Sequence, residues 1–186
     1  TPTATITKTV NNNKNVLTAV VTPADTLSSY VYEWYKDGNK ISNATGLSYV
    51  TTESGTYQFK VKTGSGKVVD SNEITIDGYT ITYNLNGGTG SIKKKKKIQD
   101  LSTNVTSTIP TKDGYEFLGW GVSSTDTTAD YSSNATYTAN ENINLYAIWK
   151  KTVTVTFNGN GATLTGTTTP TCDMYNADTN CTVTAP

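Results

Sequence analysis

The sequence Asp-Gly-Tyr-Glu-Phe-Leu-Gly-Trp at residues 113–120, followed by Leu-Tyr-Ala-Ile-Trp at residues 145–149, decides the fold of this chain. Side chains two apart in a strand share one face, so Tyr115 and Phe117 are expected on the same face, between two glycine turns. An aromatic side chain buries roughly 150 to 250 Å², so two such strands can supply most of the core of a small module. The residues predicted for this core are Tyr115, Phe117, Trp120, Leu145 and Trp149.

Three segments in order resemble the Listeria-Bacteroides repeat, the internalin-type B repeat. They are Tyr-Thr-Ile-Thr-Tyr-Asn-Leu-Asn-Gly-Gly at 79–88, Pro-Thr-Lys-Asp-Gly-Tyr-Glu-Phe-Leu-Gly-Trp at 110–120, and Asn-Leu-Tyr-Ala-Ile-Trp at 144–149. The resemblance covers residues 79–150. It implies a small β-grasp-like module of bacterial surface proteins, usually in tandem, that acts outside the cell as a stalk or adhesive unit and has no catalytic residues.

All fifteen basic residues are lysines, and they balance fifteen acidic residues. With no net charge and no arginine, the chain has neither the field nor the bidentate donors that nucleic-acid recognition uses. The absence of histidine removes the commonest general base and a common metal ligand. We therefore predict that the chain is not an enzyme, and that it has no catalytic or metal site, no cofactor and no nucleic-acid partner.

Abundant Thr, Ser, Asn, Gly and Tyr favour strands and turns, so we predict a mainly β chain. Its length suits two or three small domains, which we place at residues 1–77, 78–150 and 151–186. The first boundary is a turn and not a flexible linker, so the first two domains are expected to have little freedom to move. No signal peptide, transmembrane run or wall-anchoring tail is visible, and in a surface protein we expect these parts to lie outside this chain.

Residues 1–77 are predicted to form a β-sandwich, because short alternating strands are separated by turn signals. Trp34, and Tyr57 within Glu-Ser-Gly-Thr-Tyr-Gln-Phe at 53–59, resemble the Ig-like domains of bacterial surface proteins. The resemblance implies a core that contains Trp34, Tyr57 and Phe59, with Tyr57 as a tyrosine corner. Phe59 stands where antibody-type domains have a cysteine, so no disulfide joins the sheets.

Five consecutive lysines, Lys93, Lys94, Lys95, Lys96 and Lys97, interrupt the second domain. Their charge would suit contact with an anionic polymer such as a teichoic acid or a sulfated glycan. We favour a solvated edge strand, on which lysines block edge-to-edge pairing, because acidic residues of the same domain nearly offset the five charges. We expect the run to be exposed and dispensable for folding, because Thr-rich sequence replaces it in the third segment.

The pattern restarts in the third segment. Val-Thr-Val-Thr-Phe-Asn-Gly-Asn-Gly at 153–161 aligns with the strand of Ile81 and the turn that follows it, at an offset of 74 residues. Residues 185–186 then match residues 109–110 after an insertion of two residues. We therefore predict that 151–186 is an incomplete second copy of the repeat.

Cys172 and Cys181 both lie in this third segment. Their spacing suits a small-loop disulfide better than a redox or zinc site, which fits an oxidising, extracytoplasmic setting. If the chain end is accidental, only the second domain and the disulfide should hold residues 151–186. If it is native, a neighbouring chain should add the missing strand, and the protein would self-associate into a filament.

Two main classes of function stay open. The domains could form a rigid stalk or spacer of a bacterial surface protein, or they could act as an adhesin that binds a host or cell-wall glycan or protein. A spacer should give no saturable binding signal at any salt concentration, and this property separates the two classes.

Overall fold

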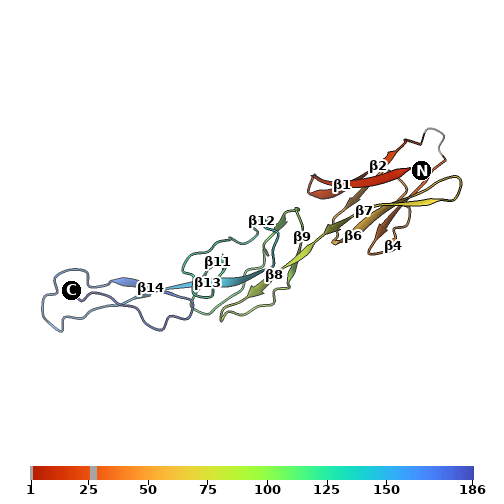
Figure 1. Ribbon diagram of the computed structural model, residues 1–186. Helices are drawn as coiled ribbons and strands as arrows, with labels where there is room; N and C mark the ends of the chain where they lie inside the picture. Colours follow the sequence, from red (N-terminus) through yellow and green to blue (C-terminus); the bar gives the residue numbers. More distant parts are fainter. Residues whose placement is uncertain (1, 26–28) are drawn as a thin grey trace. The chain divides into compact units, whose positions relative to one another are not determined.

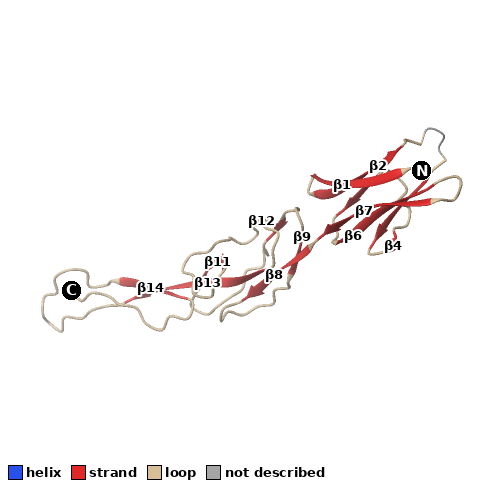
Figure 2. Cartoon of the chain, in the orientation of Figure 1, coloured by secondary structure: helices blue, strands red, loops and turns tan. Residues whose placement is uncertain are grey.

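The computed structural model describes residues 2–25 and 29–186 (Figure 1). The chain packs into two compact units whose segments alternate along the sequence. The first unit is Thr1–Tyr79 with Lys96–Thr103 and Thr138–Glu141, and the second is Thr80–Lys95, Asn104–Tyr137 and Asn142–Pro186. In Figure 2 the described residues form strands and loops without a helix, which confirms the mainly β prediction.

The first unit contains a two-sheet β-sandwich. One sheet has the order β1-β2-β5, with β1 (Thr3–Asn11), β2 (Lys14–Thr22) and β5 (Ser48–Thr51). The other has the order β4-β3-β6-β7, with β4 (Asn39–Lys40), β3 (Val31–Lys36), β6 (Gly55–Lys62) and β7 (Val68–Ile76). Alternate side chains of both sheets point inward and share one core. Its buried members are Ala4, Ile6, Leu17, Ala19, Trp34, Tyr57, Phe59, Val61 and Ile76.

Trp34, Tyr57 and Phe59 are fully buried in this core. The rings of Trp34 and Phe59 lie 5.0 Å apart between centroids, and the Trp34 indole donates a hydrogen bond to the Gly46 carbonyl over 2.8 Å. The Tyr57 hydroxyl donates to the Glu53 carbonyl over 3.1 Å. This contact with the backbone a few residues upstream is the one that a tyrosine corner makes. The Ig-like class of the domain stays a prediction.

The remaining strands form a mixed sheet with the order β11-β13-β8-β9, in which β14 also pairs with β13, and a small sheet that pairs β10 with β12. β8 runs parallel to β13, whereas β11 and β14 run antiparallel to it. The bounds are β8 (Gly78–Asn84), β9 (Lys95–Ile98), β10 (Thr103–Asn104), β11 (Glu116–Gly121), β12 (Thr136–Tyr137), β13 (Ile143–Thr154) and β14 (Thr171–Tyr175).

Aromatic side chains from β11 and β13 form the centre of the second unit. The Phe117 ring meets the rings of Trp120 and Trp149 edge-on, with centroids 5.3 and 5.5 Å apart. The ring centroid of Tyr83, on β8, lies 4.9 Å from that of Trp120. Trp120, Leu145 and Trp149 are buried. Most of this core therefore comes from residues 113–120 and 145–149, and β8 adds Tyr83.

β13 continues beyond residue 150 without a break. Its final residues pair with β14 in the register Lys150↔Tyr175 to Thr154↔Thr171, and the Val155 amide extends the pairing to the Pro170 carbonyl over 3.0 Å. The third segment therefore forms a long hairpin on the strand that also completes the repeat.

A few local features recur at the offsets of the predicted internal repeat, which stays a prediction. Asn86 and Asn160 both have φ 48°, and each amide N–H donates to the side chain of an asparagine two residues earlier, over 2.8 and 2.9 Å. Gly90 and Gly166 also correspond, at an offset of 76 residues, and each lies close to a proline at the same offset. A Cβ added at Gly90 would lie 3.7 Å from Pro110 Cα, and one added at Gly166 would lie 3.6 Å from Pro186 Cα. After the two-residue insertion, the offset of 76 residues places β14 on β9.

Candidate functional site

The lysine run does not form one exposed surface. Lys93, Lys94 and Lys96 are exposed and Lys95 is half-buried, but Lys97 is fully buried. The expectation that the whole run is exposed is therefore wrong at Lys97, because successive residues of β9 point to opposite faces. Contact with an anionic polymer, for which Lys97 was also a candidate, is left to the other four lysines.

Tyr115 also differs from its predicted position in the core. β11 begins at Glu116, so Tyr115 precedes the strand, and its half-buried ring lies 4.3 Å from the ammonium of Lys112 and 5.7 Å from that of Lys151. The strand starts one residue later than the alternation of aromatic residues suggested. Phe117 is half-buried and keeps its contacts with the two tryptophans.

The predicted disulfide is present. Cys172 and Cys181 are bonded to each other, with a Cα–Cα distance of 6.1 Å, and the described residues include no free cysteine. Cys172 lies on β14 opposite Val153 of β13. The disulfide therefore attaches the chain after β14 to a strand of the hairpin.

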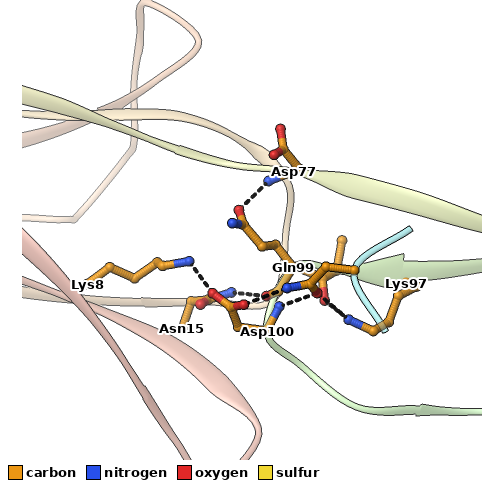
Figure 3. Close-up of polar contacts among 8 residues, drawn as sticks. Lys8, Asn15, Asp77, Lys97, Gln99 and Asp100 are labelled. Atoms are coloured by element: carbon orange, nitrogen blue, oxygen red, sulfur yellow. Dashed lines mark hydrogen bonds and ion pairs between the residues drawn. The ribbon is translucent and has the colours of Figure 1, made fainter. Parts of the chain in front are cut away.

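A dense set of polar contacts follows the end of β9, within the first unit (Figure 3). Lys8 on β1 forms an ion pair with Asp100 over 2.6 Å. The side chain of Asn13, in the turn between β1 and β2, accepts from the Ser102 amide over 2.7 Å and donates to the Ser102 carbonyl over 3.0 Å. Buried Asn15 on β2 donates to the Gln99 carbonyl over 3.3 Å. Residues 99–102 are thus held on the β1–β2 hairpin.

Gln99 also holds the single residue that separates β7 from β8. The Gln99 amide N–H donates to the Asp77 carbonyl over 2.9 Å, and the Gln99 side-chain Oε1 accepts from the Asp77 N–H over 3.0 Å (Figure 3). Next to it, Ile98 packs against the core of the sandwich. We call the contacts of residues 98–102 with residues 8–15 and Asp77 the first junction.

Lys97, Asp100 and Asn140 form a smaller cluster beside the first junction. Lys97 Nζ donates to Asn140 Oδ1 over 2.9 Å and to the Ile98 carbonyl over 2.8 Å. The Asp100 N–H donates to the same Oδ1 over 2.8 Å, while Asn140 Nδ2 donates to the Asp100 carboxylate over 2.7 Å. These bonds fix both ends of the Asn140 amide.

The cluster shifts two ionisation equilibria in the same direction. The hydrogen bond from Lys8, followed by that from Asn140, lowers the pKa of the Asp100 carboxyl below its ordinary value. Burial lowers the pKa of the Lys97 ammonium, because loss of solvent penalises the charged form. The carboxylate is thus stabilised in its charged form, and the amine is moved toward its neutral form.

A comparable set of contacts occurs in the second unit around Asn176, directly after β14. The Asn176 amide N–H donates to the Trp149 carbonyl over 3.0 Å, and its side-chain Oδ1 accepts from the Trp149 N–H over 3.0 Å. Its Nδ2 donates to the Asp126 carbonyl over 2.6 Å, and Lys112 Nζ donates to the Asn176 carbonyl. We call these contacts the second junction.

The two junctions use the same pairing. In each, one amide residue in the turn after a strand bonds both the carbonyl and the N–H of a residue on an earlier part of the chain: Gln99 with Asp77, and Asn176 with Trp149. No local sequence pattern singles out Gln99, Asp100, Asn140 or Asn176. The repeat offset was the available signal, since it aligns the turn after β9 with the turn after β14.

At each junction one residue thus uses both its side-chain amide and its backbone N–H to bind the backbone of another residue. Among the described residues, no group of three or more His, Cys, Asp or Glu side chains could hold a metal ion. In the same part of the chain, no helix has the length and apolar character that crossing a membrane requires.

Comparison with known proteins gave one family. Residues 79–148 match the Listeria-Bacteroides repeat domain, which confirms the repeat predicted from the sequence. Such domains are typical of bacterial surface proteins and are not known as catalytic. No curated protein and no solved structure matched the chain.

Proposed function

A Listeria-Bacteroides repeat domain spans residues 79–148, and on this premise we propose that the chain is a rigid spacer segment of an extracellular bacterial surface protein. The observation that carries this proposal is the short connection between successive domains. A spacer must transmit position from one domain to the next, which a long flexible linker would not do.

Connections between the successive domains are short. Only Asp77 separates β7 from β8, and β13 itself runs from the repeat into the third segment. The first junction adds an ion pair and several hydrogen bonds on one side of Asp77. Short connections with such contacts favour restricted motion, whereas a flexible linker would be longer and rich in Gly or Ser.

The disulfide supports an extracellular location for this spacer. Disulfides persist in oxidising compartments and are rare in the reducing cytosol. The bond between Cys172 and Cys181 is therefore in keeping with a surface protein.

A second candidate is adhesion through the exposed lysines. Lys93, Lys94 and Lys96 are exposed, and no ion pair among the described residues involves any of them. Three adjacent exposed cations could bind an anionic cell-wall polymer or a sulfated glycan, with an affinity that falls as salt rises.

One binding experiment tests both candidates. The 186-residue chain and a variant with Lys93, Lys94 and Lys96 changed to Thr are applied to arrays of teichoic acids and sulfated glycans at low and moderate salt. A spacer gives no saturable signal with either protein. Saturable binding that the variant loses would instead support adhesion, and saturable binding that the variant retains would contradict both candidates.

A further inference from the structure

Lys97 holds a position that costs free energy and that the junction contacts do not explain. It is fully buried, and the hydrogen-bond partners of its Nζ are two uncharged oxygens, Asn140 Oδ1 and the Ile98 carbonyl. An ammonium buried against neutral acceptors is unfavourable compared with a solvated or ion-paired one. Burial lowers the pKa of Lys97, and it outweighs the opposite effect of the nearby Asp100 charge. A neutral amine has a free electron pair and is a nucleophile.

The amide of Asn140 presents a carbon next to this amine. Lys97 Nζ lies 2.9 Å from Oδ1, which is one covalent bond from Cγ. The Asp100 N–H also donates to Oδ1, over 2.8 Å. A fixed backbone donor at this oxygen would stabilise the negative charge that develops there when a nucleophile adds to the carbon.

Asp100 also contacts the group that would leave. Its carboxylate accepts from Asn140 Nδ2 over 2.7 Å. The amide is thereby oriented, since Oδ1 faces two donors and Nδ2 faces an acceptor. Asn140 and Asp100 both reach the surface, so a small leaving molecule has a path to solvent.

We propose that Lys97 and Asn140 become joined by an intramolecular amide bond, with Asp100 moving the proton. Neutral Nζ adds to Cγ of Asn140, and the carbonyl electron pair moves to Oδ1, opposite the Asp100 N–H. Once Nζ is bonded to Cγ it lies beside Nδ2, which the Asp100 carboxylate already contacts, and the carboxylate then takes the surplus proton from Nζ and returns it to Nδ2. The Cγ–Nδ2 bond then breaks, the carbonyl reforms, and ammonia leaves. The step is an amide exchange and consumes no oxidant or reductant.

Such a bond would close a covalent loop from β9 to residue 140. Both ends of the loop lie in the first unit, beside the first junction. The bond would keep residues 97–100 attached when the surrounding hydrogen bonds open, because unfolding could no longer separate the two ends. In the third segment the residue that corresponds to Lys97, at the offset of 76 residues, is Asp173. Its carboxylate forms an ion pair with Lys150 over 2.8 Å. That segment cannot form the bond, and it carries the disulfide instead.

Intact mass spectrometry of the reduced 186-residue chain tests the proposal directly. The folded protein should be lighter than its sequence mass by one ammonia, and a tryptic digest should contain a branched peptide that joins Lys97 to Asn140. A chain of full sequence mass would overturn the proposal. This measurement on the unchanged protein does not depend on any variant folding.

Three variants identify the atoms involved. Lys97→Met and Asn140→Ala should each restore the full mass, while Lys96→Met, at the exposed neighbour, should keep the deficit. A cyclic imide at Asn140 would also lose ammonia, but it would persist in Lys97→Met and give no branched peptide, which would overturn the proposal. Asp100→Asn, with an unchanged circular dichroism spectrum, should slow or abolish the loss of ammonia. An undiminished rate would remove Asp100 from the mechanism.

Discussion

Lys97 is buried because alternate residues of β9 point to opposite faces, a fact that a run of identical residues conceals. In an ordinary strand the change between polar and apolar residues shows which face is inward. Five lysines carry no such contrast, so the sequence could not show that one of them turns inward. Buried lysines are rare without a specific partner, and the partner here is Asn140, which lies 43 residues further along the chain.

Replacing single lysines of the run should separate the buried residue from its exposed neighbours. Lys97→Thr removes buried methylenes and takes one donor from Asn140 Oδ1 and one from the Ile98 carbonyl, which then keep only the N–H groups of Asp100 and Leu101. We expect the free energy of unfolding to fall by about 2 to 4 kcal/mol, measured by chemical denaturation. Lys94→Thr, the exposed control, should change it by less than about 0.5 kcal/mol. Equal effects of the two substitutions would contradict the burial of Lys97.

Asp100 should make the first unit sensitive to acid. Its pKa is lowered in the folded protein, first by Lys8 and then by Asn140. A depressed carboxyl pKa contributes stability that is present above the unfolded pKa and is lost as the pH falls through the folded pKa. The Asp100 side chain is 38% exposed, so solvent screening keeps this contribution small.

The pH dependence can be measured with a matched pair of variants. Between about pH 5 and pH 2, the unfolding free energy of the unchanged protein should fall more than that of Asp100→Asn. Asp113→Asn, which removes an exposed carboxylate outside the junctions, should follow the unchanged protein. Parallel curves for the unchanged protein and Asp100→Asn would show that the ion pair with Lys8 does not contribute.

The turns after β9 and β14 have the same role although their sequences differ. Asp100 and Asn176, which align at the offset of 76 residues, both have positive φ, 63° and 50°. Asn and Asp tolerate this conformation better than other residues with a Cβ. The turns therefore keep their backbone geometry, while the pairing amide belongs to Gln99 in one and to Asn176 in the other.

Asn176→Gly tests the second junction without straining the backbone, because glycine accepts positive φ. The variant loses the bonds of the side chain to the Trp149 N–H and the Asp126 carbonyl. We expect the unfolding free energy to fall by roughly 1 to 3 kcal/mol, with faster hydrogen exchange along β14. Asn160→Gly, at an exposed turn residue with φ 48°, is the control and should have a smaller effect. A larger effect at Asn160 would contradict the importance of the second junction.

Features that depend on local pattern were predictable from the sequence. Strand alternation identified Trp34, Phe59 and Trp149 as inward-facing, the resemblance to the repeat placed Trp120 in the core, and the spacing of the cysteines indicated the disulfide. The position of Tyr115 was missed because alternation gives no exact strand start. The junctions were missed because their partners, such as Lys8 and Asp100, lie far apart in sequence and neither residue is distinctive alone.

For the molecule as a whole, the spacer proposal depends on the domains moving together. The contacts of residues 98–102 with the sandwich and Asp77 lie within the first unit, and those of Asn176 with Trp149 lie within the second. The proposal predicts that the two units tumble together, because only Asp77 separates β7 from β8.

Nitrogen-15 relaxation of the 186-residue chain in solution measures this coupling most directly. If the first junction is rigid, the amides of β1, β2, β6 and β7 and those of β8, β11 and β13 should fit one common rotational diffusion tensor. A variant with Gln99→Ala and Asp100→Ala should then need separate tensors for the two groups. Separate tensors in the unchanged protein would contradict the rigid spacer.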